Sequence, residues 1–303
     1  MTHDAWRLHL TNQTLQRVDI LPGSPALLAV WSRADRVAYY DLESGNRVDG
    51  ARLMFPKESD RTSLEWQNFV DSLHGPNGTP LPYVRVGHVG IYSMLDRKTR
   101  VYRIGDQVIR QQGATETALS LPPGLAVIQP SRTSGKVYAL GGDGRLYIDD
   151  DFPLPTGLKP SPHYMLAVGS SGECLFASDG WHIVALDHKG LTRSTLDLSY
   201  LSSQLVCSPQ GKYLAMQDVE TGVVRVFDGA TLRQLYQRFA IDLVAAARRL
   251  QLLEDLPPVT AALGTMTIDD EGVLAFAMSG SVCVTHVTRM SKIPAPSAPL
   301  SSS

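Results

Sequence analysis

A serine in a glycine-rich turn is the first group in this sequence that could do chemistry. Gly169-Ser-Ser-Gly172 places two hydroxyls between glycines. A hydrolase nucleophile of this kind sits on a tight strand-to-helix turn, with one residue between the serine and each glycine. The spacing here is different, so we expect a loop that leads into a strand.

The eight histidines and three cysteines are the candidates for metal ligands. No two histidines have the helical spacing beside a carboxylate that zinc hydrolases use. His182 and His188 flank one apolar run, where we expect a hydrogen-bonded histidine and a turn residue. Cys174, Cys207 and Cys283 lie singly in or beside apolar runs, which favours buried free thiols. The sequence therefore predicts neither a metal nor a cofactor.

Two further stretches could bind ions. Asp149-Asp150-Asp151 offers adjacent carboxylates to a hard cation such as calcium, but its position before Pro153 favours a solvated turn at a sheet edge. Gly141-Gly-Asp-Gly144 precedes a strand, whereas a phosphate-binding loop opens a helix. We expect this stretch to be a hairpin turn.

Composition narrows the classes of partner. The chain has 28 basic and 30 acidic residues, a net charge of −2, and no basic run longer than a pair such as Arg248-Arg249. Nucleic-acid binding relies on clustered basic residues. The polar start Met1–Arg7 does not resemble a secretory signal, and no run of ~18 apolar residues occurs. We expect a cytoplasmic protein that binds neither nucleic acid nor membrane.

A repeated pattern predicts the elements that position these residues. An apolar run, a glycine-containing or charged turn and a second apolar run recur, most similarly in Ala34–Gly45 and Gly211–Gly222. Weaker copies begin at Gly87, Gly135, Gly172 and Gly272. Strand-turn-strand repeats of roughly 40 residues are typical of a β-propeller. We expect an all-β fold over residues 1–289, a single β-propeller of six, alternatively seven, four-stranded blades.

Two intervals between repeats are too long, and each contains a stretch of helical periodicity. We expect inserted helices near residues 60–73 and 240–256. A propeller closes its core without such helices, so their apolar faces either dock a partner protein or pack on the ring. The candidate partner-binding residues are Trp66, Phe69, Val70 and Leu73 in the first helix, and Leu243, Leu250 and Leu253 in the second.

The two ends of the chain suggest how the ring closes. The last repeat, Thr265–Val287, lacks an outer strand, so we expect an N-terminal strand to pair beside Val282–His286. Trp6–Leu10 and Leu15–Ile20 look like a hairpin before the first full blade. Residues 290–303 are rich in proline and serine, which predicts a disordered tail.

The best-formed repeat carries a resemblance to a known family. Gln204–Gln237 contains four short apolar runs separated by turns, and the part from Gly222 onward resembles the third and fourth strands of a WD-repeat blade. Phe227-Asp228 stands where that family has Trp-Asp. Gly135–Ile148 and Asp179–Gly190 resemble blades of quinoprotein-type propellers. The first resemblance implies a scaffold that holds protein partners, and the second implies a redox cofactor.

Taken with the missing catalytic motifs, these features predict a non-catalytic scaffold for protein–protein interaction. We expect it to be a subunit of a larger cytoplasmic bacterial assembly that binds one or more proteins. The alternative is an enzyme, lactonase-like or quinone-dependent, with its site at the mouth of the central channel. Propeller active sites draw residues from several blades, so no linear motif is required for that alternative.

Overall fold

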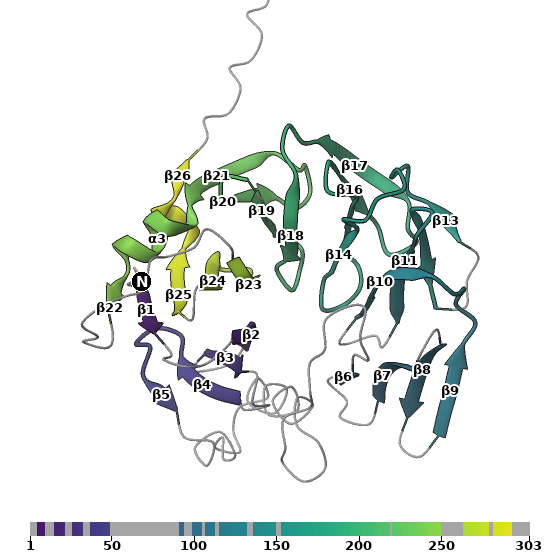
Figure 1. Cartoon of the computed structure of the whole chain (residues 1–303), viewed down its shortest axis with the longest axis horizontal. Helices are drawn as coiled ribbons and strands as arrows, with labels where there is room; N and C mark the ends of the chain where they lie inside the picture. Colours follow the sequence, from purple (N-terminus) through teal and green to yellow (C-terminus); the bar gives the residue numbers. More distant parts are fainter. Residues whose placement is uncertain are drawn as a thin grey trace, which may run out of the picture.

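In the computed structural model, most of the described residues lie in β-strands. The described residues are 5–9, 15–21, 26–32, 37–48, 91–93, 99–104, 107–112, 115–131, 136–149, 153–218, 220–249, 263–278 and 281–292. They form several sheets that are antiparallel except for one short parallel edge pair. Figure 1 shows these sheets arranged around a common centre, an all-β, β-propeller-like arrangement.

The most regular sheet follows the predicted four-strand repeat. Its strands are β18 (Ser202–Cys207), β19 (Tyr213–Asp218), β20 (Val223–Asp228) and β21 (Gln234–Phe239). They pair in sequence order, each antiparallel to the next. Consecutive residues of β19 and β20 are buried, so both faces of these strands are covered, as in a sheet packed on both sides. The predicted unit is confirmed.

Four other sheets have the same order, from an inner strand near the centre to an outer strand at the periphery (Figure 1). The strands of the first two are β14 (Met165–Val168), β15 (Leu175–Ser178), β16 (His182–Leu186) and β17 (Thr192–Asp197), and β10 (Leu125–Pro130), β11 (Val137–Gly141), β12 (Arg145–Ile148) and β13 (Leu154–Pro155). Those of the other two are β6 (Ile91–Ser93), β7 (Thr99–Ile104), β8 (Gln107–Gln112) and β9 (Thr115–Leu119), and β2 (Leu15–Leu21), β3 (Leu27–Ser32), β4 (Val37–Asp41) and β5 (Arg47–Val48).

The remaining sheet joins the two ends of the chain. It contains β23 (Leu263–Ile268), β24 (Val273–Met278), β25 (Ser281–His286) and, beside β25, the N-terminal strand β1 (Trp6–His9). Trp6 pairs with Val284 in an antiparallel register. The predicted pairing of the N-terminus with the last repeat is therefore confirmed, and we call this the closing sheet.

The predicted N-terminal hairpin is wrong. β1 belongs to the closing sheet, whereas β2 is the inner strand of the next sheet. Trp6 is fully buried between these two sheets, and its Nε1 donates a 2.9 Å hydrogen bond to the carbonyl of Leu42. This burial fixes β1 on β25 and separates it from β2.

The second inserted helix is shorter than predicted. α3 spans Ala240–Ala246, Ala247 is extended (φ −76°, ψ 141°), and Arg248–Arg249 form strand β22. β22 lies parallel to β1 at the edge of the closing sheet. Backbone pairing with β1 therefore replaces the helical hydrogen bonds that the periodicity predicts for these residues. The predicted helix near residues 60–73 lies outside the described residues.

The chain directly after residue 289 is more ordered than predicted. The turn η1 (Val287–Arg289) leads into buried Met290 and strand β26 (Ser291–Lys292), which pairs with β21. The described chain is thus ordered through Lys292, because the edge of β21 supplies backbone partners for it. Residues 293–303 lie outside the described part of the chain.

Buried side chains fill the spaces between neighbouring sheets. Each cluster joins the facing sides of two sheets, which is how propeller blades bury both their faces. Representative buried pairs are Trp6 and Leu28, Val226 and Phe276, Phe176 and Phe227, Leu140 and Leu175, and Val101 and Val137.

The sequence spacing between the second strands of successive sheets shows where the insertions lie. These strands begin at Thr99, Val137, Leu175 and Tyr213, each 38 residues after the one before. The next second strand begins 60 residues later, at Val273. The extra residues therefore lie between β21 and β23, where α3 begins. The interval before Thr99 is also long, since the previous second strand starts at Leu27.

The two ends of the strands form two rims. The first rim carries the turns between strands one and two and between strands three and four of each sheet. There, Ser131 Oγ donates to the carbonyl of Ser170, whose N–H donates to the carbonyl of Pro209, both at 2.8 Å. Gln210 N–H then donates to the carboxylate of Asp270 at 3.1 Å. These bonds link four successive sheets.

The second rim carries the turns between strands two and three and the segments that connect sheets. In two sheets, a turn glycine accepts a hydrogen bond from the first residue of the strand or helix that follows the outer strand. The Gly180 carbonyl accepts from Ser202 N–H at 2.9 Å, and the Gly222 carbonyl accepts from Ala240 N–H at 3.1 Å. Both long connections, residues 49–90 and 240–262, start from this rim because both follow an outer strand.

Candidate functional site

The turn between β15 and β16, on the second rim, is the best-defined polar site among the described residues. Ser178, Asp179, Gly180 and Trp181 make this turn. Gly180 has φ +96°, and a Cβ there would lie 2.8 Å from the Leu201 side chain and 3.0 Å from that of His163. Only glycine combines this conformation with such a close approach.

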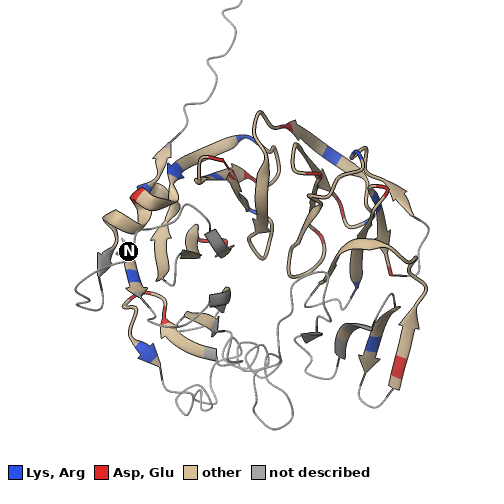
Figure 2. Ribbon diagram, in the orientation of Figure 1, with Lys and Arg blue, Asp and Glu red and all other residues tan. Residues whose placement is uncertain are grey.

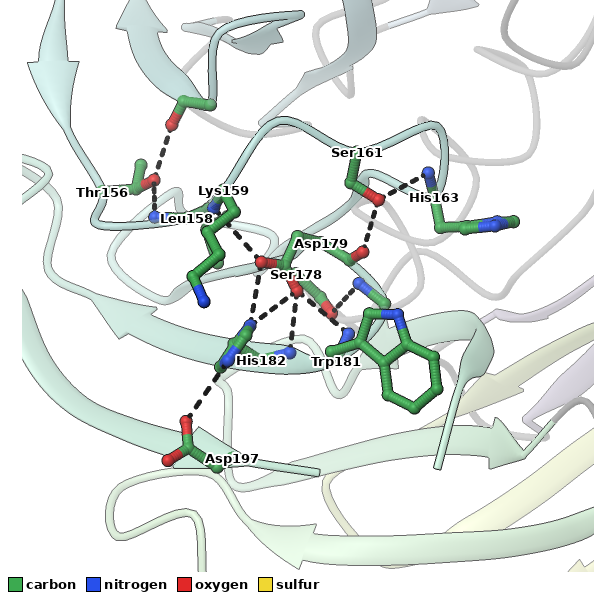
Figure 3. Close-up of polar contacts among 12 residues, drawn as sticks. Thr156, Leu158, Lys159, Ser161, His163, Ser178, Asp179, Trp181, His182 and Asp197 are labelled. Carbon is green, nitrogen blue, oxygen red and sulfur yellow. Dashed lines mark hydrogen bonds and ion pairs between the residues drawn. The ribbon is translucent and has the colours of Figure 1, made fainter. Parts of the chain in front are cut away.

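The carboxylate of Asp179 organises the turn (Figure 3). It is 2% exposed and its Oδ1 accepts hydrogen bonds from the N–H groups of Trp181 at 2.9 Å and His182 at 2.8 Å. Its Oδ2 accepts from Lys159 N–H at 3.2 Å. The carbonyl of Asp179 accepts from Ser161 Oγ at 2.6 Å. One buried residue therefore fixes both the turn and the preceding connection between sheets.

These donors keep Asp179 ionised. Burial alone would raise the pKa of Asp179, but the hydrogen bonds from Trp181, His182 and Lys159 outweigh it and hold that pKa below its usual value. A buried carboxylate is tolerated in a protein when hydrogen-bond donors surround it.

His182 lies between two carboxylates. Its Nδ1 is 2.9 Å from Asp179 Oδ2, and an ionised acceptor there requires that Nδ1 carry the proton. Its Nε2 faces Asp197 Oδ1 at 3.7 Å. This arrangement orients the imidazole as a structural donor at the start of β16. The expectation of a hydrogen-bonded histidine is confirmed at this position.

Trp181 is the exposed member of this site. Its side chain is 45% exposed, while its N–H donates to Asp179 and its carbonyl accepts from Leu198 N–H at 2.7 Å. Figure 3 shows the indole pointing away from the Asp179 carboxylate. A large aromatic ring is thus presented to solvent from a turn whose backbone is held on both sides. The sequence does not single out this residue, because exposure depends on how the connecting segment packs.

The predicted partner-binding residues do not meet at this site. Leu243 is 2% exposed and packs in the core between the closing sheet and its neighbour, so it is unavailable to a partner. Its helix instead exposes Ile241, and Phe239 just before the helix is equally exposed, both at 49%. The other candidates, Trp66, Phe69, Val70, Leu73, Leu250 and Leu253, lie outside the described residues.

The other stretches singled out in the sequence lie in turns. Gly169–Gly172 connects β14 to β15, and Gly141–Gly144 closes the hairpin of β11 and β12 with a 3.0 Å backbone hydrogen bond. Asp149 Oδ1 accepts from Val137 N–H at 2.8 Å and also from the Arg110 guanidinium. Both glycine-rich stretches therefore form the structures predicted for them, a loop that leads into a strand and a hairpin turn.

No group of three or more ligand residues that could hold a metal occurs among the described residues. In the same part of the chain, the inner strands contain one carboxylate, Asp19, and no histidine. The cysteines are unpaired, and burial raises the pKa of Cys283 to about 12. Figure 2 shows basic and acidic residues dispersed among the sheets. None of the described helices is long and apolar enough to cross a membrane.

Comparisons with known proteins show a likeness to solved structures. No family model matches this sequence, and no curated protein matches it. Among solved structures, a chain in the crystal structure of a mitotic checkpoint complex is similar, with 12% identity and a TM-score of 0.48. The match covers 91% of this chain and 76% of that chain. The sheet order described above, and not this likeness, defines the architecture.

Proposed function

We propose that this chain is a non-catalytic scaffold that binds at least one other protein through its second rim. The observation that carries the proposal is Trp181, 45% exposed on a turn that Asp179 holds rigid. Tryptophan is enriched among the residues that dominate binding energy at protein interfaces. A side chain presented by a fixed backbone loses little conformational entropy on binding, so its contacts contribute more of their energy to affinity.

The proposed architecture places further surface on the same rim. We take the ring to have six blades, one for each sheet. The connections 49–90 and 240–262 both start from the second rim, and the turn that carries Trp181 lies on the same rim. Long connections on a rigid scaffold commonly carry binding residues.

The proposed setting is a larger cytoplasmic assembly in which this chain is a subunit. Near-neutral charge, with 28 basic and 30 acidic residues, suits a protein partner better than a nucleic acid. The hydrogen bonds that link successive sheets on the first rim support a rigid body, as a scaffold requires.

Affinity capture from cells that produce the protein tests this proposal. We expect Trp181→Ala to lower recovery of the bound protein about tenfold or more, without changing the thermal unfolding midpoint. A matched control replaces the comparably exposed apolar pair on the α3 flank, in the double variant Phe239→Ala/Ile241→Ala.

The two variants separate the possible outcomes. Loss of the partner in the Trp181 variant alone supports binding at the second rim. Loss in the α3 variant alone moves the site to that flank. Retention by both contradicts the assignment of either surface. Turnover of an ester, a lactone or a quinone-linked alcohol that disappears in Asp19→Asn would overturn the non-catalytic assignment.

A further inference from the structure

The outer edge of the β14–β17 sheet differs from two other sheet edges in this molecule. Among the described residues, β17 is the last strand of this sheet, and no further strand pairs beside it. In two other sheets, an additional strand pairs beside the outer strand: β26 beside β21, and β22 beside β1. Their geometry shows that an outer edge of this molecule can accept another strand.

The backbone groups of β17 that point outward follow from its pairing with β16. His182 pairs with Asp197 and Val184 with Thr195. Leu198 N–H donates to the Trp181 carbonyl at 2.7 Å in the same register. Antiparallel pairs alternate between hydrogen-bonded and non-hydrogen-bonded types. The N–H and C=O groups of Thr195 and Asp197 therefore point away from β16, toward the open edge.

The neighbouring sheet has a short outer strand. This strand, β13, has only two residues, and Figure 1 places β13 and β17 together at the periphery. On β17, Thr195 and Asp197 are exposed, and the Asp197 side chain is 90% exposed. An approaching strand would therefore meet exposed backbone and exposed side chains along the same edge.

The charges on β17 are self-complementary. Arg193 and Asp197 are both exposed, and each lies two residues from Thr195. We propose that β17 pairs antiparallel with β17 of a second copy of this chain, with Thr195 at the two-fold axis. Arg193 of each copy then lies opposite Asp197 of the other, so one surface matches itself, as a two-fold dimer requires.

The outward backbone groups are compatible with this register. Pairing Thr195 with itself places outward groups of one strand against outward groups of the other. A register centred on Arg193 or on Asp197 would also align these groups, but it would place like charges directly opposite each other, which is destabilising. Charge therefore selects the register centred on Thr195.

Charge exchange tests the proposed dimer. The full chain is measured by sedimentation velocity over about a hundredfold range of concentration, wide enough to follow the dissociation constant. Arg193→Asp and Asp197→Arg should each weaken dimerisation at least tenfold, because each places like charges opposite each other. The double variant Arg193→Asp/Asp197→Arg restores opposite charges and should recover dimerisation to within about threefold of the unsubstituted chain.

A backbone substitution tests the strand pairing itself. Thr195→Pro removes one outward N–H and should abolish the dimer, whereas Thr195→Val keeps that N–H and should preserve it. Circular dichroism confirms that each variant is folded.

Charged side chains and the β-bulge at Arg193 are also features that can keep an edge strand unpaired. A monomer at every concentration, or a dimer that the charge exchange and Thr195→Pro leave unchanged, overturns the proposal.

Discussion

At the scale of single residues, the second rim depends on one carboxylate. Asp179 accepts N–H donors from Trp181, His182 and Lys159 while almost fully buried. Removing it would leave these donors without their acceptor, a cost of about 3 kcal/mol in the free energy of unfolding. We therefore expect Asp179→Ala to destabilise the protein by that amount in urea denaturation at neutral pH.

The pH dependence of this effect has a definite sign. The pKa of Asp179 is lower in the folded chain than in the unfolded chain. Its contribution is therefore fully present above the unfolded pKa and is lost as pH falls through the folded pKa. The stability difference between the unsubstituted protein and Asp179→Ala should shrink below about pH 4. A difference that stayed constant at lower pH would contradict the ionised role of Asp179.

Part of this site was predictable from sequence. His182 was expected to be a hydrogen-bonded histidine, because it begins an apolar run beside a turn, and it is. The exposure of Trp181 was not predictable. Tryptophan is on average a well-buried residue, whereas Trp181 is 45% exposed, and its place beside an apolar run does not reveal this.

At the scale of elements, α3 is held by packing on one face. Leu243 is 2% exposed in the core, whereas Ile241, two residues earlier, is 49% exposed. The two side chains are aliphatic and of equal size, which makes them a matched pair. We expect Leu243→Ala to cost about 2 to 4 kcal/mol of unfolding free energy and Ile241→Ala to cost less than about 1 kcal/mol.

Urea denaturation of both variants is the measurement. Equal small losses would mean that Leu243 does not pack as described, and the docking role predicted for it from sequence would return. Equal large losses would place Ile241 in a contact beyond the described residues. The expected difference assigns Leu243 to packing.

The repeats show why the strands are predictable from sequence while their order in the sheets is not. Asp41 and Asp218, which align in the most similar pair of repeats, both accept hydrogen bonds from their own turns. Gly45 and Gly222 both have positive φ, 73° and 68°. Yet β4 is the third strand of its sheet, whereas β19 is the second. The similarity between the two repeats therefore reflects the aspartate and glycine that hairpin turns commonly require. It does not indicate the position of a strand in its sheet.

At the scale of the whole molecule, the closing sheet was predictable because the sequence of the last repeat alone shows that an outer strand is missing. A last repeat without an outer strand leaves β25 as an open edge, and an N-terminal strand can cover it. The parallel strand β22 was not predictable, because its two residues continue the helical periodicity of the segment before them and are extended only where they pair with β1. The residues of β22 look like the end of a helix until β1 is in place.

Trp6 provides the test of this closure. It is fully buried between the closing sheet and the β2–β5 sheet, and its Nε1 donates to the Leu42 carbonyl at 2.9 Å. Trp6→Ala removes both the packing and the hydrogen bond, and we expect a loss of about 3 to 5 kcal/mol in unfolding free energy. Trp6→Phe keeps most of the ring and should lose about 1 kcal/mol, chiefly through the unpaired Leu42 carbonyl.

Hydrogen exchange then shows where the loss falls. If β1 closes the ring, Trp6→Ala should speed amide exchange first in β25, whose partner it weakens, and in the hydrogen-bonded turn after β4. The strands β18 to β20 do not pair with β1 and serve as the internal control. Faster exchange spread evenly over all sheets would indicate one cooperative unit in which β1 has no special place, whereas unchanged exchange in β25 would show that β1 does not hold the edge.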